Sequence, residues 1–254
     1  MKRNTITILA LGFLLQFSAL VAAAESPVNL TGRHVVFLIC EDEYKADQTL
    51  PVFARLLTDR CHCRCTVLLG TAQGIEGLAA LKTVDAMVLF VRRKALPQEQ
   101  LAAIRAYLDS GKPLVALRTS CHAFVLRRAK PRAGEDQWPA FDAEVLGCHY
   151  GDHFPNDVGS EIANSPETAG DSLLTGVQPG SWHSSGSLYK VLPLATGCKV
   201  LMTGRVAEHV EPVTWTRMYK HGRVFSTTLG HPDDFTLPQF QQLLINAISW
   251  AVAK

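Results

Sequence analysis

The sequence lacks two features that nucleic-acid-binding proteins share, an excess of positive charge and an extended Lys/Arg run. It has 25 Lys and Arg against 23 Asp and Glu, and loss of Lys2 and Arg3 with a leader would leave 23 basic residues. A chain with balanced charge has no electrostatic footprint for the phosphate backbone. We therefore expect no nucleic-acid partner.

The chain also has no internal repeat, low-complexity tract or linker, and beyond its first residues no apolar stretch long enough to span a membrane. Its beginning differs. Met1-Lys2-Arg3 precedes an apolar run centred on Ile8 to Leu20, and Ala22-Ala23-Ala24 closes it, an order typical of a secretory signal peptide. We predict a signal peptide over residues 1–24, export to the periplasm or outside, and no membrane contact after cleavage. An uncleaved anchor helix is the alternative.

The seven cysteines are an odd number, so in an exported protein at least one thiol has no partner within the chain. The segment Cys61-His62-Cys63-Arg64-Cys65 has the look of a metal cluster. If it leads into a strand, however, Cys61 and Cys65 share one face and Cys63 takes the other, which fits tetrahedral zinc poorly. Buried or redox-labile thiols are the interpretation we favour.

Apolar strands alternate with amphipathic helices in the first half of the chain. We expect strands at 34–40, 65–69, 84–91 and 112–117, and helices at 48–59 and 97–110. Near-continuous apolar runs are typical of strands that are covered on both faces. The alternation predicts an α/β fold, with a doubly wound, mostly parallel sheet of the flavodoxin-like kind and helices on both faces.

The second half is less regular. Residues 130–181 are rich in Gly, Pro, Asp and His, as functional loops inside compact domains often are. Strands are expected at 186–191 and 199–203, followed by a hairpin of 213–217 and 223–228 and an amphipathic helix at 237–252. We expect residues 25–254 to form a single α/β domain.

Chemically reactive side chains follow three of the expected strands, and sites in doubly wound sheets form at the carboxyl ends of strands. Glu41 follows the first strand, residues 118–122 the fourth, and His231 the last. Arg118 at such an end can hold a carboxylate, a phosphate or a pair of sugar hydroxyls. The alternative is a structural ion pair with Glu41, Asp42 or Glu43.

Several neighbours of these strand ends are candidate site residues as well. Ser120 is a candidate substrate contact, and Glu41, His122 and His183 are candidate acid–base groups. Trp182 and Tyr150 are candidates for stacking against a sugar ring, although either can equally be part of the core.

Three histidines are the candidate metal ligands. His149 and His153 are four residues apart, and His153, His183 and His231 come from separate segments that we expect to reach the same rim. Such a set suits zinc or a related divalent ion with an open coordination position. A hydrogen-bonded structural role is the alternative for each of them.

Four segments together resemble the ThuA-like (trehalose utilisation) proteins of the class I glutamine amidotransferase-like superfamily. They are Arg118-Thr-Ser-Cys-His-Ala-Phe124, Phe141-Asp-Ala-Glu-Val-Leu-Gly147, Glu211-Pro-Val-Thr-Trp-Thr216 and Gly222-Arg-Val-Phe-Ser-Thr-Thr-Leu-Gly-His231. The resemblance runs from about His34 to Val252 and implies the amidotransferase-like fold. It also implies that Arg118 stands where amidotransferases carry their nucleophilic cysteine.

A guanidinium stays protonated and cannot attack a carbonyl, so glutamine hydrolysis by the usual mechanism is not expected. Cys121, three residues on, is conceivable as a displaced nucleophile if a helix start lowers the pKa of its thiol. His122, its neighbour in sequence, is expected to point away from it.

These observations leave three functions open. The resemblance favours an exported enzyme of carbohydrate metabolism that acts on a small sugar or sugar derivative by hydrolysis, isomerisation or elimination. The second is a non-catalytic sugar-binding or accessory protein, and the third a cysteine hydrolase that uses Cys121. A homo-oligomer remains compatible with all three.

Overall fold

The computed structural model describes residues 28–177 and 180–253. The predicted signal peptide, residues 1–24, therefore lies outside the described residues. Within them, no helix is both long and apolar enough to cross a membrane.

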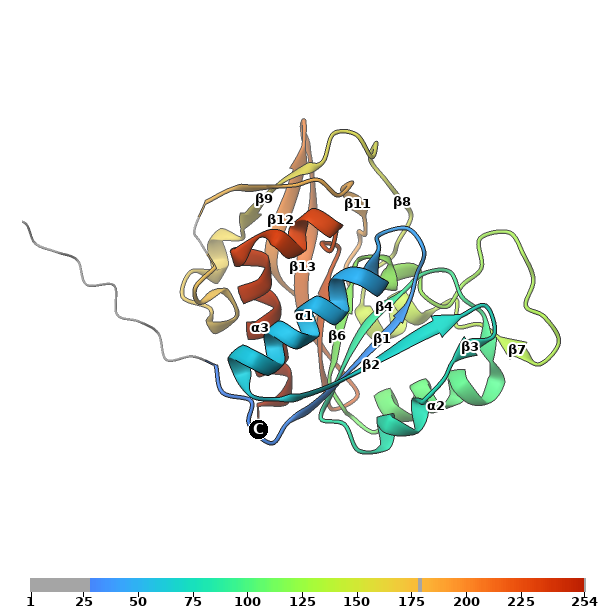
Figure 1. Cartoon of the computed structure of the whole chain (residues 1–254). Coiled ribbons are helices and arrows are strands. Elements are labelled where there is room, and N and C mark those ends of the chain that lie inside the picture. The colour runs from blue at the N-terminus through green and yellow to red at the C-terminus, as the bar shows by residue number, and fades with distance from the viewer. Residues whose placement is uncertain (1–27, 178–179, 254) are drawn as a thin grey trace, which may run out of the picture.

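A ten-stranded sheet forms the centre of the molecule, in the order β10-β9-β12-β13-β14-β6-β4-β1-β2-β3 (Figure 1). Its strands are β1 (His34–Cys40), β2 (Arg64–Thr71), β3 (Gly74–Ile75), β4 (Ala86–Val91), β6 (Leu114–Leu117), β9 (Ser160–Asn164), β10 (Trp182–Ser184), β12 (Lys199–Val206), β13 (His209–Tyr219) and β14 (Gly222–Thr227). Two small sheets pair β5 (Leu96–Pro97) with β7 (Glu135–Asp136) and β8 (Asp152–His153) with β11 (Tyr189–Lys190).

Three α-helices and several short helical turns connect these strands. The α-helices are α1 (Ala46–Cys61), α2 (Gln98–Asp109) and α3 (Pro238–Val252). The short turns are η1 (Leu78–Lys82), η2 (Arg118–His122), η3 (Asp142–Leu146), η4 (Pro166–Thr168), η5 (Ser172–Leu174) and η6 (Pro232–Thr236).

The sheet combines a parallel and an antiparallel part. Neighbouring strands from β2 through β1, β4 and β6 to β14 run parallel, whereas β14-β13, β13-β12, β12-β9, β9-β10 and β2-β3 are antiparallel. The fold is thus mixed α/β, and the expectation of a mostly parallel sheet is wrong for the antiparallel part, from β14 to β10. The β13-β14 hairpin reverses the chain direction at the edge of the parallel part, and β12, β9 and β10, which precede it in the sequence, continue the sheet in antiparallel pairs. The doubly wound arrangement stays a prediction.

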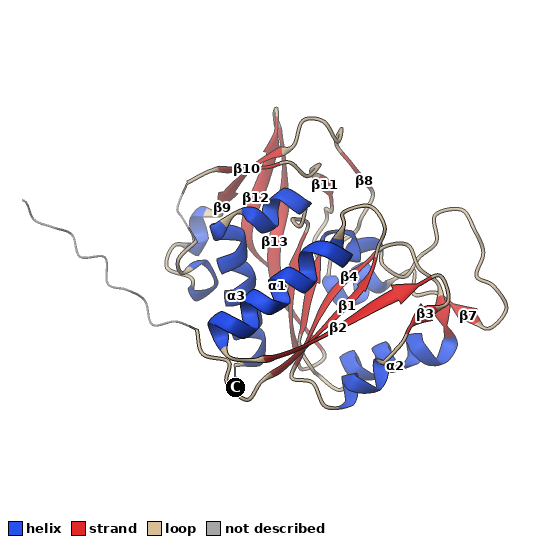
Figure 2. Ribbon diagram, viewed as in Figure 1, coloured by secondary structure: helices blue, strands red, loops and turns tan. Residues whose placement is uncertain are grey.

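Both faces of the sheet are buried, as the apolar strands predict. Along β1, Val35, Phe37 and Ile39 belong to one hydrophobic cluster, and Val36 and Leu38 to the other. Helices α1 and α3 pack into the first cluster, and α2 packs into the second, so helices lie on both faces (Figure 2).

Most expected elements are present, with shifted ends. The hairpin and the final helix are confirmed, and the helix expected at 48–59 extends over Ala46–Cys61. The strand expected at 186–191 is reduced to β11, outside the main sheet. The irregular segment contributes β9 to the main sheet. This strand was not predicted, because it has only five residues and lies in a segment rich in Gly and Pro.

The seven cysteines are free thiols. The Sγ atoms of Cys63 and Cys65 lie 3.7 Å apart, so the expected opposite placement of these two side chains is wrong. Cys63 directly precedes β2, which begins at Arg64, and side chains two residues apart in an extended chain lie on the same side, so the two thiols are neighbours.

Candidate functional site

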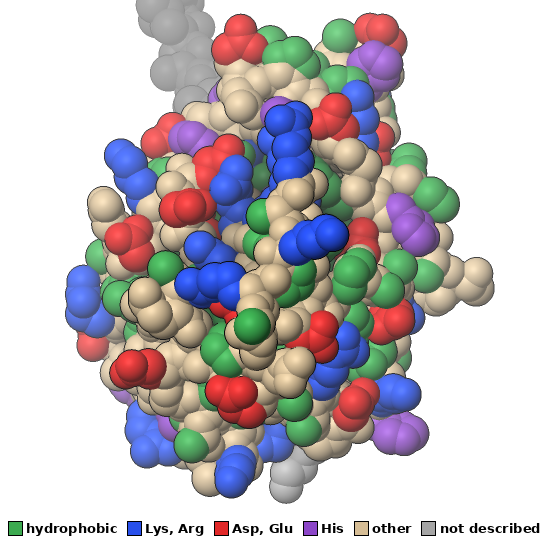
Figure 3. Space-filling model, turned by 90° about the vertical axis from the view of Figure 1, so that its right-hand side faces the viewer, with side chains coloured by type: hydrophobic (Ala, Val, Ile, Leu, Met, Phe, Trp, Pro, Cys, Tyr) green, Lys and Arg blue, Asp and Glu red, His purple; other side chains and the backbone are tan. Residues whose placement is uncertain are grey.

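The loops that follow β1, β4 and β6 are hydrogen-bonded to one another at the carboxyl ends of these parallel strands. The backbone N–H of Arg92 donates to Cys40 O at 2.9 Å, that of Arg93 to His122 O at 3.1 Å, and that of Lys94 to Ala123 O at 2.7 Å. Figure 3 shows the side of the molecule on which the loop before β7 projects, with Lys and Arg side chains gathered around its middle. At the carboxyl ends of the parallel strands, where we expect a site, hydrogen bonds thus hold the loops together.

Arg118 begins the turn after β6 in a strained backbone conformation. Its φ is 43°, a left-handed value that costs a non-glycine residue about 1 kcal/mol or more and that clusters at functional sites. Its side chain is 2% exposed. The Nη1 atom donates to Thr228 O at 2.8 Å, and Nη2 to Ser187 Oγ at 3.4 Å.

Aromatic rings, not carboxylates, surround the Arg118 guanidinium. Its Cζ lies 4.0 Å from the ring centroid of Tyr44 and 4.8 Å from that of Tyr189. A Cβ on Gly186 would lie 2.6 Å from Nη1, so this backbone approaches the cation closely. The alternative role of Arg118, an ion pair with Glu41, Asp42 or Glu43, is not seen among the described residues. Arg118 acts instead as a buried platform beneath two tyrosines.

The acidic loop after β1 has two other roles. Both carboxylate oxygens of Glu41 accept backbone N–H groups, from Glu43, Tyr44 and Ala46 at 2.6–2.7 Å. Asp42 and Glu43 pair with Arg92, at 3.2 and 2.5 Å. Glu41 therefore holds the loop that leads into α1, and its hydrogen bonds leave it poorly suited to the catalytic role expected of it.

Ser120 is also committed to backbone contacts. Its Oγ donates to Leu89 O at 2.8 Å, and the side chain is 1% exposed. Thr119 likewise donates to Val91 O at 3.0 Å. These bonds attach the turn η2 to β4, so the expected contact of Ser120 with a substrate finds no support in its position.

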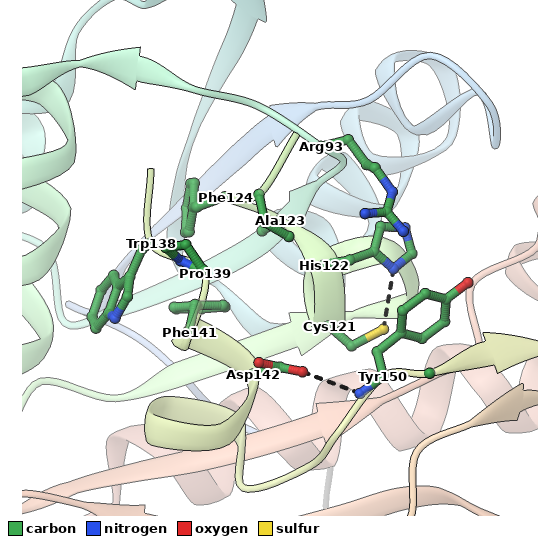
Figure 4. A pocket seen from close by; sticks show the side chains of 12 residues that line it. Arg93, Cys121, His122, Ala123, Phe124, Trp138, Pro139, Phe141, Asp142 and Tyr150 are labelled. Carbon is green, nitrogen blue, oxygen red and sulfur yellow. Dashed lines mark hydrogen bonds between the residues drawn. The ribbon is translucent and has the colours of Figure 1, made fainter. Parts of the chain in front are cut away.

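His122 lies in the wall of a cavity of about 280 Å³ (Figure 4). In Figure 4 the side chains of Arg93, His122 and Tyr150 converge on one side of the cavity, with an aromatic group formed by Phe124, Trp138 and Phe141 on the other. The ring centroids of His122 and Tyr150 are 4.3 Å apart. The predicted His122 and Tyr150 thus share one cavity.

His122 is 6% exposed. Burial, together with the positive charges of Arg93, Arg92, Arg118 and Arg127, lowers the pKa of His122 to about 3. The imidazole is therefore neutral at physiological pH. A neutral ring both donates and accepts a hydrogen bond, which suits it to hold a hydroxyl group or to polarise a carbonyl.

Cys121 contacts His122 more closely than expected. Its Sγ lies 3.6 Å from His122 Nδ1 and 3.2 Å from Arg118 O, so the expectation that His122 points away is wrong. The short 3₁₀ turn brings both side chains toward Tyr150 (Figure 4). Burial raises the pKa of the Cys121 thiol well above its ordinary value, which is the opposite of activation by a helix start.

A second, smaller hollow of about 50 Å³ shares Arg93, His122 and Tyr150 with the first. Its other lining residues are Glu43, Tyr44, Arg92, Arg127, His153 and Tyr189. The sequence analysis did not predict a role for these basic residues, because Arg92-Arg93-Lys94 and Arg127-Arg128 are too short to count as a basic run. Their position directly after strand ends was the available signal.

The predicted metal ligands are not gathered into a metal site. His149 is exposed, and His153 Nδ1 lies 2.7 Å from Phe154 O. His231 caps η6, where its Nδ1 accepts from Asp233 N at 3.3 Å. Among the described residues no group of three or more His, Cys, Asp or Glu side chains could hold a metal ion. The structure does not bring His149, His153 and His231 together, since His149 is exposed and the rings of His153 and His231 each make a local backbone contact.

The remaining two candidates lie on the edge strand β10. His183 is exposed and its Nδ1 lies 2.9 Å from Glu161 Oε1. Trp182 packs against the hydrophobic cluster of α1 and α3, on the face of the sheet that does not carry the His122 cavity. Trp182 and His183 therefore do not line either hollow.

The sequence model of a family described as "ThuA: Trehalose utilisation" matches residues 36–251. Among solved structures, a ThuA-like protein of Bacteroides uniformis is 15% identical with a TM-score of 0.66, over 92% of this chain and 96% of that one. A ThuA-like protein of Parabacteroides merdae is 15% identical with a TM-score of 0.60, over 90% and 91%.

A cytoplasmic protein of Salmonella typhimurium is 13% identical with a TM-score of 0.59, over 86% of this chain and 98% of that one. No curated protein matches the sequence. At these identities the structural likenesses establish the fold alone.

Proposed function

Since the chain belongs to the ThuA (trehalose utilisation) family, we propose that it is an enzyme of carbohydrate metabolism that binds a small sugar or sugar derivative in the His122 cavity. The observation that carries the proposal is the neutral His122, which shares a cavity wall with Arg93 and Tyr150. The carbohydrate class rests on the family description. The cavity adds the size and the polar groups that such a ligand needs.

Each of the three side chains has a role in this proposal. His122 donates or accepts a hydrogen bond at a substrate hydroxyl or carbonyl, and Arg93 stabilises negative charge that develops on the substrate oxygen. Tyr150 packs against His122 at 4.3 Å, and burial raises the pKa of its hydroxyl, so this hydroxyl stays protonated as a donor. Such an arrangement favours proton transfer or isomerisation next to a carbonyl over nucleophilic attack.

A non-catalytic sugar-binding protein is the second candidate. Two observations favour it. The pKa of about 3 makes His122 a weak base, and Arg118 occupies the turn where a nucleophile would stand. The third candidate, a cysteine hydrolase, is disfavoured because Cys121 is 4% exposed with a raised pKa.

Calorimetric titration of the tag-free protein with monosaccharides and disaccharides, trehalose among them, tests the proposal. We expect His122→Gln to weaken binding about tenfold or more, the loss of a buried hydrogen bond. The matched control is His221→Gln. This histidine is exposed and lies in the turn before β14, at the amino end of that strand, whereas the cavity lies at the carboxyl ends of the parallel strands.

Proton NMR of the same mixtures then separates the two leading candidates. New sugar signals that disappear in His122→Gln support the enzyme, and binding with unchanged sugar signals supports the binding protein. Failure of every sugar to bind would remove both.

We also propose that the protein is exported, on the sequence of residues 1–24. Amino-terminal sequencing of protein recovered from the periplasm or medium tests this. A chain that starts at Glu25 supports export, and a chain found in the cytoplasm with Met1 in place contradicts it.

A further inference from the structure

Two short basic segments, far apart in sequence, lie side by side at the mouth of the His122 cavity. Residues 92–94 (Arg-Arg-Lys) follow β4 directly, and residues 127–130 (Arg-Arg-Ala-Lys) come shortly after η2. Backbone hydrogen bonds from Arg93 and Lys94 to His122 and Ala123 join the first loop to η2. Positive charge is thereby concentrated at one opening of a chain that is close to neutral as a whole.

Only part of this charge is already neutralised by acidic side chains. Arg92 pairs with Asp42 and Glu43. Within residues 28–177 and 180–253, the guanidinium groups of Arg93 and Arg127 have neither an ion pair nor a hydrogen bond. Arg93 is partly buried and lies over the Tyr150 ring, with its Cζ 5.9 Å from the centroid. A partly desolvated guanidinium without a counter-charge, such as that of Arg93, with a second, exposed one beside it, is suited to bind a carboxylate or a phosphate.

The charge also reaches the interior of the cavity. After burial, the causes that lower the pKa of His122 are four cations, of which Arg93 is the strongest. The volumes of about 280 and 50 Å³ lie at or below the lower end of the range of roughly 300–1,000 Å³ for small-molecule sites. The space therefore suits one sugar unit with one charged group.

We propose that the ligand of the His122 cavity is an anionic sugar derivative, either a sugar acid or a sugar phosphate, whose charged group lies between Arg93 and Arg127. The hydroxyl groups of the ligand then extend toward His122 and Tyr150. This inference rests on the proposed function, and it narrows the substrate class from sugars in general to sugars that carry a carboxylate or a phosphate.

The test is calorimetric titration of the full tag-free chain with a matched set of three ligands, a hexose, its aldonate and its 6-phosphate, with inorganic phosphate as a fourth. We expect one of the anionic sugars to bind at least about tenfold more tightly than the hexose, the size of one charge-assisted hydrogen bond. The stronger of the two identifies the charged group as carboxylate or phosphate.

Variants assign the binding to the two arginines. We expect Arg93→Gln and Arg127→Gln each to weaken binding of the anionic sugar about tenfold, and to weaken binding of the hexose by clearly less. The control is Arg55→Gln, an exposed arginine on α1, which covers the other face of the sheet. Arg127 is exposed, so its variant reports on binding even if Arg93→Gln folds poorly.

Two outcomes would overturn the inference. If the hexose binds as tightly as both anionic sugars, the proposed function stands and the anionic class is wrong. If inorganic phosphate binds as tightly as the sugar phosphate and no sugar adds affinity, the arginines hold an adventitious ion only, and the proposed function fails as well.

Discussion

His122→Gln replaces a buried imidazole, whose native pKa of about 3 lies far below its ordinary 6.5, by a side chain that does not titrate. A lowered pKa means that the unfolded chain binds a proton more readily than the native protein. The native protein therefore has the full contribution of the neutral ring above pH 6.5, and loses it as the pH falls toward 3.

The size of the effect follows from the two pKa values. At pH 5 the unfolded imidazole is almost fully protonated and the native one is not, so the free energy of unfolding falls by about 2 kcal/mol relative to neutral pH. If the pH could be lowered below 3 without other changes, the loss would approach about 5 kcal/mol.

Urea unfolding of the wild-type protein and of His122→Gln at pH 7.5 and pH 5.0 measures this contribution. All other titrating groups are common to the two proteins and cancel in the difference. We expect the wild type to lose about 2 kcal/mol more than the variant between these two pH values. Equal losses would show that His122 is not held neutral by burial and the neighbouring arginines, and the role given to it in the cavity would be wrong.

Three further predictions concern groups around the site. Asp234→Ala leaves the buried N–H groups of Gly230 and His231 without their acceptor, so urea unfolding should show a loss of about 2–4 kcal/mol, and a smaller one for Asp234→Asn; equal losses would contradict this account. Glu41→Ala should cost about 1–3 kcal/mol because three backbone N–H groups lose their acceptor, whereas a catalytic Glu41 would lose turnover with unchanged stability. Iodoacetamide at pH 7.5, followed by peptide mass spectrometry, should modify Cys65, whose pKa is lowered by its hydrogen bond to Cys63, long before the buried Cys121, whose pKa is raised. Comparable rates at the two thiols would support Cys121 as a nucleophile.

The sequence predicts the parallel part of the fold well because its signals are local. The run Val35–Cys40 is apolar throughout, and the whole strand His34–Cys40 is buried. The hairpin of β13 and β14 is closed by a short turn that the sequence also shows. The antiparallel extension was not predicted, since which strand pairs with which depends on contacts between distant segments. Strand β9 lies in a segment that local composition assigns to loops.

The site was predicted in outline and not in detail. That η2 would carry His122 at a strand end follows from strand order, and this position is confirmed. The partners of individual side chains were not predictable in the same way. For Arg118 the sequence left open a contact with substrate or an ion pair with carboxylates, and the side chain lies among tyrosines. Tyr44 and Tyr189 reach it from distant segments whose approach only the folded chain defines.

The strained turn at Arg118 bears on any attempt to place a nucleophile there by substitution. The left-handed backbone at this position, with φ at 43°, would be inherited by the cysteine of an Arg118→Cys variant. The arginine, however, fills the space beneath Tyr44 and Tyr189 and donates to Thr228 and Ser187. A short side chain would leave a void there and remove the cation on which both rings rest. In this protein the turn serves to support the packing of Tyr44 and Tyr189. A nucleophile at position 118 would therefore need further substitutions that fill the space left by the arginine side chain.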